Sequence, residues 1–85
     1  MNTDDARHQL RQFILNNYLF TDDQAALADD TSFLDNGILD SMGILELVDF
    51  INETFGVKVA GGELVPENLD SINSVLKFLT NKTQG

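Results

Sequence analysis

The sequence predicts an all-α fold, a small four-helix bundle with a long first loop and a short third helix. Apolar residues recur three and four positions apart in three segments of the 85-residue chain, which is the period of an amphipathic helix. The one strand-like alternation, at Val57 and Val59, has no second strand to pair with. The length allows one core. We therefore expect a single domain over residues 1–85, with an ordered core at about 4–80 and a flexible C-terminal tail.

The first helix is expected to begin at Thr3, which can cap it, and to run to about Leu19. Two acidic residues follow Thr3, in the turn where negative charge suits the helix dipole. The apolar positions have helical spacing, and they are Leu10, Phe13, Ile14 and Leu19, with Tyr18 beside them. His8, the only histidine, lies in the polar part of this helix with no serine near it, so we assign it no role.

A long connection, Phe20 to Asp40, follows the first helix. Loops beyond about 12–15 residues are uncommon in compact domains unless they are functional or packed against the rest of the molecule. We expect a short helical turn near Gln24 to Leu27 and a tight turn at Asn36-Gly37. Apolar residues of the connection are expected to pin it to the helices, and they are Leu27, Phe33, Leu34, Ile38 and Leu39.

Five aspartates in this connection ahead of Asp40 raise the question of a calcium site. If Gly37 is the sixth residue of an EF-hand loop, Ser32 is the first and Gly43 the twelfth, so both ligand positions lack a carboxylate. The sequence therefore excludes an EF-hand and predicts no metal site. A loosely cation-binding acidic loop stays open beside the interpretation that we favour, a solvated acidic surface.

The second helix is predicted from Ser41 to Phe55, with Asp40 as its N-cap and Gly56 as its C-cap. Its core face consists of Ile44, Leu47, Val48, Ile51 and Phe55. The opposite side carries Met42, Leu45, Glu46, Asp49 and Glu53. Two apolar residues among three acids are either ordinary exposed side chains or a docking patch for a basic partner. Without the adjacent serine, the first interpretation is favoured.

The remainder of the chain predicts an extended connector followed by two helices. The valines of the connector are expected to point inward, and a helical turn is expected at Glu63 to Val65. Pro66 begins a short third helix that ends at Leu69. Asp70 or Ser71 caps the last helix, whose apolar positions are Ile72, Val75, Leu76 and Leu79. The chain is expected to fray from Thr80 to Gly85.

Composition narrows the classes of partner. Fourteen acidic and five basic residues give a net charge of -9, which repels nucleic acid and anionic membranes and favours basic proteins. No apolar run approaches the roughly 20 residues that span a bilayer, and the N-terminal residues are polar, so we expect a cytoplasmic protein without membrane insertion. The absence of cysteine excludes disulfides, thiolate metal sites and a cysteine nucleophile.

With Asp40-Ser41-Met42 at the start of the second helix, the chain resembles the acyl and peptidyl carrier proteins. In that family a D-S-L or D-S-M tripeptide begins the second of four helices, so the resemblance implies an acyl-carrier-protein-like bundle. It extends from about Asp5 to Leu79. It includes the G-x-x-D-S spacing from Gly37, the pair Glu46-Leu47, and the F-G-V-x-V segment from Phe55 to Val59.

The resemblance implies a carrier and not an enzyme. Ser41, flanked by Asp40 and Met42, would receive 4′-phosphopantetheine from coenzyme A through a phosphopantetheinyl transferase. The arm would hold acyl or aminoacyl groups as thioesters, and downstream acyl-transfer or condensing enzymes would take them. The short third helix of the family gates entry of the cargo to the core. Partners would dock on Asp35, Met42, Leu45, Glu46, Asp49 and Glu53, and we expect a monomer.

Local segments refine this resemblance toward stand-alone carriers that adenylate-forming ligases load, with the D-alanyl carrier protein as a cousin. Thr31 to Leu34, Gly43 to Val48 and Pro66 to Ser71 carry this likeness. Gly43 replaces an acid that fatty-acid-synthase carriers usually have, and Asn52-Glu53-Thr54 keeps only one acid of a usual run. Fatty acid, polyketide and nonribosomal peptide biosynthesis all stay open as pathways.

Two alternatives to a carrier are an interaction module and a hydrolytic enzyme. A cofactor-free acidic helical interaction module would need no Ser41 hydroxyl. A hydrolytic enzyme with Ser41 as nucleophile would need a nearby base, and the chain offers only His8 and no G-x-S-x-G elbow. The carrier is the function that we expect.

Overall fold

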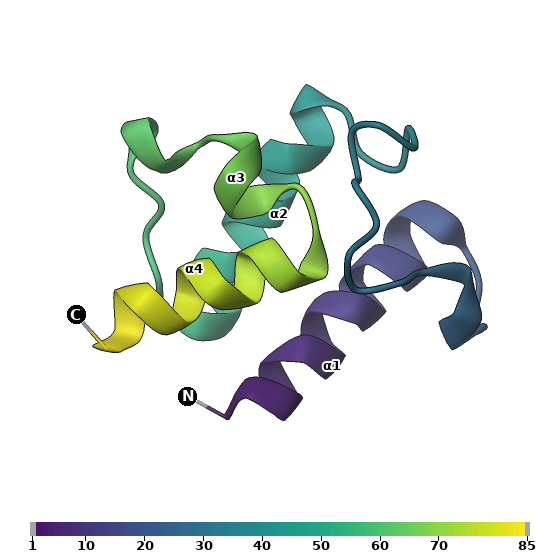
Figure 1. The fold of residues 1–85 in the computed structure, drawn as a ribbon, viewed down its shortest axis with the longest axis horizontal. Coiled ribbons are helices and arrows are strands. Elements are labelled where there is room, and N and C mark those ends of the chain that lie inside the picture. The colour runs from purple at the N-terminus through teal and green to yellow at the C-terminus, as the bar shows by residue number, and fades with distance from the viewer. Residues whose placement is uncertain (1, 85) are drawn as a thin grey trace.

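Four α-helices form the fold in the computed structural model, which describes residues 2–84 (Figure 1). They are α1 (Thr3–Ile14), α2 (Ser41–Phe55), α3 (Pro66–Leu69) and α4 (Ile72–Gln84), with a π-helical turn η1 (Leu15–Leu19) and 3-10 turns η2 (Gln24–Ala26) and η3 (Gly61–Glu63) between them. The described residues contain no strand. The predicted all-α bundle with a long first loop and a short third helix is confirmed.

The first helix begins one residue earlier than the predicted cap. The side-chain oxygen of Asn2 accepts hydrogen bonds from the amides of Asp4 and Asp5, at 3.0 and 3.2 Å, so Asn2 is the N-cap and Thr3 is the first helical residue. The prediction of Thr3 as cap is wrong because asparagine, the better capping residue, precedes it. Helical structure continues through η1 to Leu19, as predicted, and ends at Phe20, whose φ is +54°.

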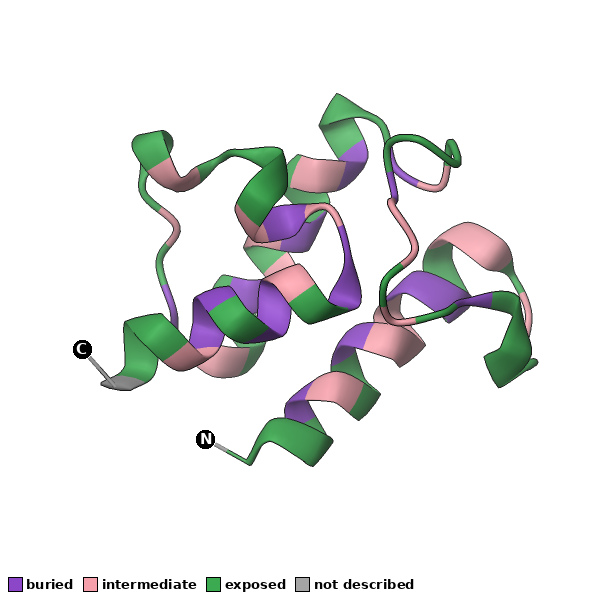
Figure 2. Cartoon of the chain, in the orientation of Figure 1, coloured by how far each residue is buried: buried purple, intermediate pink, exposed green. Residues whose placement is uncertain are grey.

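The core draws on every helix and on the first loop (Figure 2). All four predicted core positions of α4 are buried, and Leu47 and Ile51 of α2 are buried as well. Among the loop residues, Leu27, Phe33 and Leu39 are buried and Ile38 is half-buried. The prediction that Leu34 pins the loop is wrong, because its side chain is 40% exposed beside a groove described below.

Polar contacts also hold the long loop in place. Arg11 contacts Asp29 at 2.7 Å, and the amide of Asn73 donates to the carbonyl of Asp29 at 2.9 Å. Farther along, the carboxylate of Asp70 accepts from the Ser32 hydroxyl and from the Leu34 amide. The loop is therefore fastened both to α1 and to the junction of α3 and α4. Among the described residues no group of three acidic or histidine side chains is placed to hold a metal ion.

The helical turn after α2 lies two residues earlier than predicted. We expected it at Glu63 to Val65, but it spans Gly61–Glu63, because the Glu63 carboxylate accepts from the Ala60 amide at 2.9 Å and closes the turn from its C-terminal side. The connector before it is extended as predicted, with Val57 buried and Val59 half-buried.

The last two helices begin where the sequence predicts. Pro66 is the first residue of α3, and Ser71 is the cap of α4, since its hydroxyl oxygen accepts from the Ser74 amide at 3.1 Å. Helix α4 continues to Gln84, past Thr80, where we expected it to fray. The flexibility of the tail stays a prediction, and Gly85 lies outside the described residues.

Candidate functional site

Ser41 lies at the start of α2, where three local features fix the chain. Gly37 adopts a φ of +67° in the turn that precedes the helix, and the side chain of Leu39 is buried. Asp40 then caps α2, because its carboxylate accepts from the Gly43 amide at 2.8 Å while its carbonyl accepts from the Ile44 amide at 2.9 Å. The predicted cap and both predicted ends of α2 are confirmed.

The surroundings of Ser41 favour an anion. The amides of Ser41 and Met42 have no acceptor among the described residues, so the positive end of this 15-residue helix keeps two free donors. No acidic residue lies in the first turn of α2. A phosphate ester on the Ser41 hydroxyl would lie beside donors of the kind that bind phosphate at helix N-termini.

The chain contains a second Asp-Ser dipeptide, and the structure separates the two. Ser71 is 8% exposed, and its hydroxyl donates to the Ser74 hydroxyl at 2.9 Å while accepting from the Ser74 amide. Ser41 is exposed, and its hydroxyl has no hydrogen bond within the part of the chain that the structure describes. Ser41 is therefore the hydroxyl of this pair that a modifying enzyme can reach.

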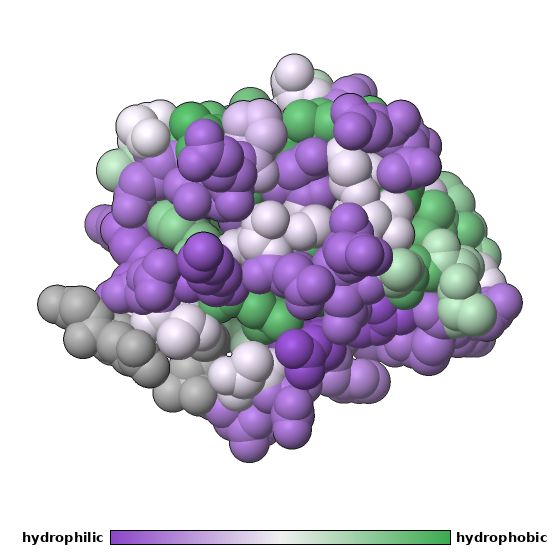
Figure 3. Space-filling model, viewed as in Figure 1, coloured by the Kyte–Doolittle hydropathy of each residue, from purple (hydrophilic) through white to green (hydrophobic). Residues whose placement is uncertain are grey.

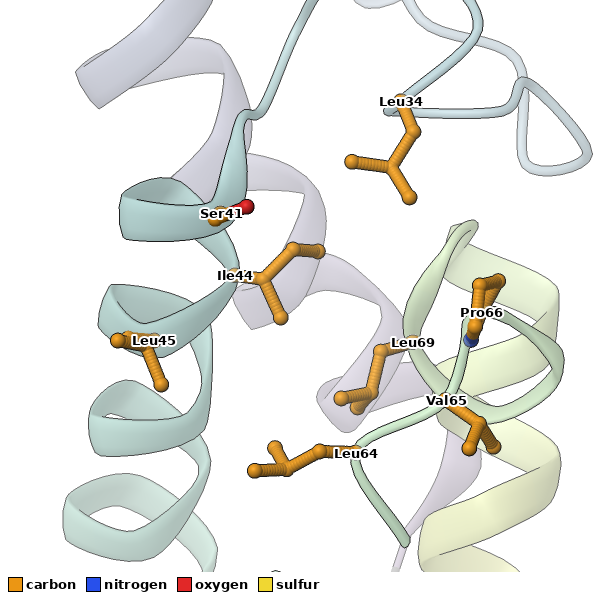
Figure 4. Close-up of a pocket in the computed structure, with 8 residues that line it drawn as sticks. All are labelled: Leu34, Ser41, Ile44, Leu45, Leu64, Val65, Pro66 and Leu69. Carbon is orange, nitrogen blue, oxygen red and sulfur yellow. The ribbon is translucent and has the colours of Figure 1, made fainter.

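An apolar groove of about 250 Å³ opens beside Ser41 (Figure 4). One wall comes from α2 and the other from the segment that enters α3, while Leu34 of the long loop closes the end nearest Ser41. In Figure 4 the Ser41 oxygen lies on the side of α2 that faces this groove. The lining residues are Leu34, Ser41, Ile44, Leu45, Leu64, Val65, Pro66 and Leu69.

The groove walls include residues that the sequence did not predict to line a site. Leu34, Leu64 and Val65 are 37–40% exposed, and Figure 3 shows hydrophobic side chains at the surface along the upper edge of the molecule, over the segment that leads into α3. The sequence signal for a groove at these three residues is weak, because each is an apolar residue that belongs to no helical stripe. Only the folded chain brings these segments together.

The predicted docking residues of α2 share one exposed face. Met42 is 67% exposed and Leu45 49%, and Glu46, Asp49 and Glu53 are also exposed, on the side of the helix opposite Leu47 and Ile51. Asp35 is exposed in the turn before α2, close in sequence to the same end of the helix. We call Met42, Leu45, Glu46, Asp49 and Glu53 the docking face. His8 is exposed on α1.

Tyr18 approaches the docking face from η1. Burial raises the pKa of the Tyr18 phenol, and the nearby carboxylates of Glu46 and Asp40 raise it further. Because both effects favour the protonated form, the phenol is neutral at physiological pH. It therefore adds apolar contact and no charge beside Glu46.

The site lies within a region that matches a known protein family. The family model described as phosphopantetheine attachment site matches residues 19–79, a range that includes Ser41, every lining residue of the groove and the whole docking face. No curated protein matches the chain. In the described residues, no helix has both the length and the apolar character needed to cross a bilayer.

Proposed function

We propose that Ser41 carries 4′-phosphopantetheine in this chain, which belongs to the phosphopantetheine attachment site family. This is the family of acyl and peptidyl carrier proteins, whose members bear the group covalently and are not themselves catalytic. The observation that supports Ser41 most directly is its exposed hydroxyl at the first position of α2, inside the matched range.

The residues around Ser41 fit the group. The exposed hydroxyl is available for esterification, the free amides of Ser41 and Met42 suit phosphate oxygens, and the adjoining groove is lined by apolar side chains. When attached, 4′-phosphopantetheine supplies a thiol on a flexible arm, which holds an acyl group as a thioester. The chain itself has no cysteine that could compete for the cargo.

Attachment forms a bond between the Ser41 hydroxyl oxygen and the pantetheine-side phosphorus of the coenzyme A diphosphate. The phosphoanhydride bond breaks, and adenosine 3′,5′-bisphosphate leaves. We propose that the hydroxyl proton passes to a base that the transferase supplies, since no described side chain is hydrogen-bonded to the Ser41 hydroxyl. Asp40 does not serve as that base in our proposal, because its carboxylate is engaged with the Gly43 amide. Its part is to hold Ser41 at the end of the helix.

The carrier interacts with a phosphopantetheinyl transferase and with acyl-handling enzymes. We propose that these partners dock on Asp35 and the docking face, with apolar contact from Met42 and Leu45 and with charge from the acids. Exposed ion pairs are each worth less than about 1 kcal/mol, which suits brief and reversible encounters. We further propose loading by an adenylate-forming ligase, on the likeness to ligase-served carriers.

The groove supports a proposal about the cargo. Seven of its lining residues are apolar, and a charged ammonium group would lose its hydration there without gaining a partner. We therefore propose that an apolar acyl chain can shelter in the groove, whereas an aminoacyl group would stay outside. We also propose that residues 1–85 act as one monomeric carrier domain, because a net charge of -9 opposes self-association.

Intact mass spectrometry tests the attachment site. The chain is incubated with coenzyme A and a broad-specificity phosphopantetheinyl transferase, together with Ser41→Ala and the matched control Ser71→Ala. We expect one phosphopantetheine increment on the wild type and on Ser71→Ala, and none on Ser41→Ala. An increment that persists in Ser41→Ala would overturn the proposal.

Substitution of Met42 tests the docking face. We expect Met42→Ser to raise the KM of the transferase for the chain several-fold while leaving the free energy of unfolding nearly unchanged, because the side chain is 67% exposed. The control is Phe20→Ser. The Phe20 side chain is 81% exposed, which is more than that of Met42, and it lies outside the docking face. Equal effects of the two substitutions on KM would contradict docking through Met42.

A further inference from the structure

Two stacked phenylalanine rings lie between α1 and α2, beside the acidic half of the docking face. Phe13 of α1 and Phe50 of α2 have ring centroids 4.3 Å apart and planes inclined by 19°. Both rings are half-buried, so neither is fully enclosed by the core. Phe55 meets Phe50 edge-on at 6.1 Å, and Tyr18 meets Phe13 edge-on at 5.8 Å, which holds the stacked pair from both ends.

A groove of about 220 Å³ has these two rings as its apolar part and three carboxylates as its polar part. It is lined by Phe13, Glu46, Asp49, Phe50 and Glu53. Glu46, Asp49 and Glu53 are spaced three and four residues apart, so they follow one side of α2 alongside the Phe50 ring. We call this site the ring groove. It is separate from the apolar groove beside Ser41, with which it shares no lining residue.

The charge of the ring groove is not balanced within the described residues. Arg7 and Arg11 are both paired with Asp29, and Lys82 is paired with Glu63. No ion pair in the described part of the chain reaches Glu46, Asp49 or Glu53. Glu53 also lies in the last turn of α2, where a negative charge is unfavourable with the helix dipole. A cation from outside the chain would balance the three carboxylates and would also offset the unfavourable interaction of Glu53 with the helix dipole.

The wall of the rings that faces α1 carries side-chain amides and one histidine, and no carboxylate. A neighbouring cavity of about 420 Å³ reaches the same two rings from this side, and its lining residues are His8, Gln9, Gln12, Phe13, Asn16, Asn17 and Phe50. Side-chain amides can accept hydrogen bonds from a bound donor without repelling its charge. A flat cation on the rings would therefore meet carboxylates on one side and amides on the other.

We infer that the ring groove binds an arginine side chain of a basic partner protein. A guanidinium group is planar, so it can stack on a phenyl ring and at the same time donate two parallel hydrogen bonds to a carboxylate. A lysine ammonium can lie over a ring, as Lys82 lies over Phe78 at 5.8 Å, but it is not planar and cannot combine stacking with two parallel bonds to a carboxylate. The groove adds α1 to the docking face and gives it a preference for arginine over lysine, which the acids alone would not provide. The inference rests on the proposed function only in assigning the arginine to a protein partner.

Nuclear magnetic resonance titration tests this inference on the unmodified chain. The probes are a capped nonapeptide with three arginines separated by glycines and its counterpart with three lysines. We expect the arginine peptide to bind about two- to fivefold more tightly, because only the planar guanidinium can stack on a ring and donate two parallel bonds to a carboxylate at once. The largest amide shift changes are expected at Asp49, Phe50 and Glu53.

Three variants separate the ring groove from general acidity. Glu53→Gln should weaken binding of the arginine peptide, whereas the matched Glu67→Gln, an exposed glutamate on α3, should leave it unchanged. Phe50→Leu should abolish the preference for arginine over lysine. Ser41→Ala should bind the arginine peptide like the wild type. The peptide result therefore does not depend on whether Ser41 carries 4′-phosphopantetheine. Equal affinities of the two peptides, or equal effects of the two Glu→Gln variants, would overturn the inference.

Discussion

At the residue scale, Asp40 shows how one side chain prepares the site without reacting. Its carboxylate satisfies the Gly43 amide and its carbonyl satisfies the Ile44 amide. These two bonds leave the first two amides of α2 for an outside acceptor. The hydroxyl of Ser41 therefore lies where backbone donors are concentrated, and this position follows from the cap, not from a contact of the hydroxyl itself.

Substitutions of Asp40 separate capping from charge. Asp40→Ala removes the acceptor for the Gly43 amide, and loss of an N-cap costs about 1 kcal/mol of unfolding free energy. Asp40→Asn keeps a good capping side chain and should cost less. Urea denaturation followed by circular dichroism measures both. If the two variants lose the same unfolding free energy, Asp40 stabilises the helix through its charge. The account of Asp40 as a hydrogen-bonding cap would then be wrong.

The residue scale also shows why sequence alone identifies Ser41 and not its surroundings. The pattern Asp40-Ser41-Met42 marks the serine and its helix, but Asp70-Ser71 repeats the dipeptide at the start of α4. Burial distinguishes them, because Ser71 is 8% exposed and bonded to Ser74. That burial depends on how α3 and α4 pack together, which no local pattern contains.

At the element scale, Glu63 ties the turn η3 to the last helix. Its carboxylate accepts from the Lys82 ammonium group at 2.9 Å and from the Ala60 amide at 2.9 Å. Lys82 lies in the last turn of α4, where positive charge suits the helix dipole. The segment that forms one wall of the apolar groove is therefore held at η3, next to Leu64.

Titration of Glu63 tests this link. The hydrogen bond from Lys82, and then the one from the Ala60 amide, lower the pKa of Glu63 below its ordinary value of 4.5. The associated stability is therefore present above pH 4.5 and is lost as the pH falls through the folded-state pKa. Carbon-13 resonance of the carboxylate measures this pKa. We expect Lys82→Met to raise it toward 4.5 and the matched Lys77→Met to leave it unchanged. A Glu63 pKa that changes in Lys77→Met and stays the same in Lys82→Met would contradict the link between Glu63 and Lys82.

The same scale shows which elements a sequence pattern can place. Helix α2 has strong signals at both ends, Asp40 as cap and Gly56 with a φ of +67°, and its predicted bounds match the structure. The turn η3 has no such signal. The Glu63 carboxylate closes it by accepting from the Ala60 amide, and Glu63 also pairs with Lys82, 19 residues later, a contact that no local pattern contains. The π-helical geometry of η1 likewise gave no sequence signal.

At the scale of the whole molecule, uneven charge is the dominant surface property. The chain has a net charge of -9, and only four ion pairs occur among the described residues. Figure 3 shows a largely hydrophilic face, with hydrophobic side chains confined to small areas. Like charges repel one another in the folded state, and this repulsion opposes compactness.

Salt should therefore stabilise the fold. Raising sodium chloride from about 10 mM to about 150 mM shortens the Debye length from about 30 Å to about 8 Å, which screens the repulsion between exposed carboxylates. We expect the Tm to rise by a few degrees. Glu53→Gln should raise the Tm at low salt and reduce its salt dependence, because Glu53 has no cation partner in the described residues. A Tm that falls with added salt would show that the ion pairs outweigh the repulsion.

Both grooves are properties of the whole molecule and could not be predicted from the sequence. The apolar groove joins α2, the long loop and the segment entering α3, and the ring groove joins α1 and α2. Helical spacing predicted which face of each helix is apolar. It did not predict that Phe13 and Phe50 meet as a stacked pair or that Leu34 faces Ser41 across a groove, because these contacts depend on helix positions set by the entire core.

Localisation of the modified residue tests the central claim most directly. The wild-type chain is incubated with coenzyme A and the transferase, digested, and fragmented in a tandem mass spectrometer, so that the attached group is assigned to one side chain. The account predicts that all of it is on Ser41. Attachment at Ser71, Ser32 or Ser74, or a chain that stays unmodified beside a positive control carrier, would contradict the account.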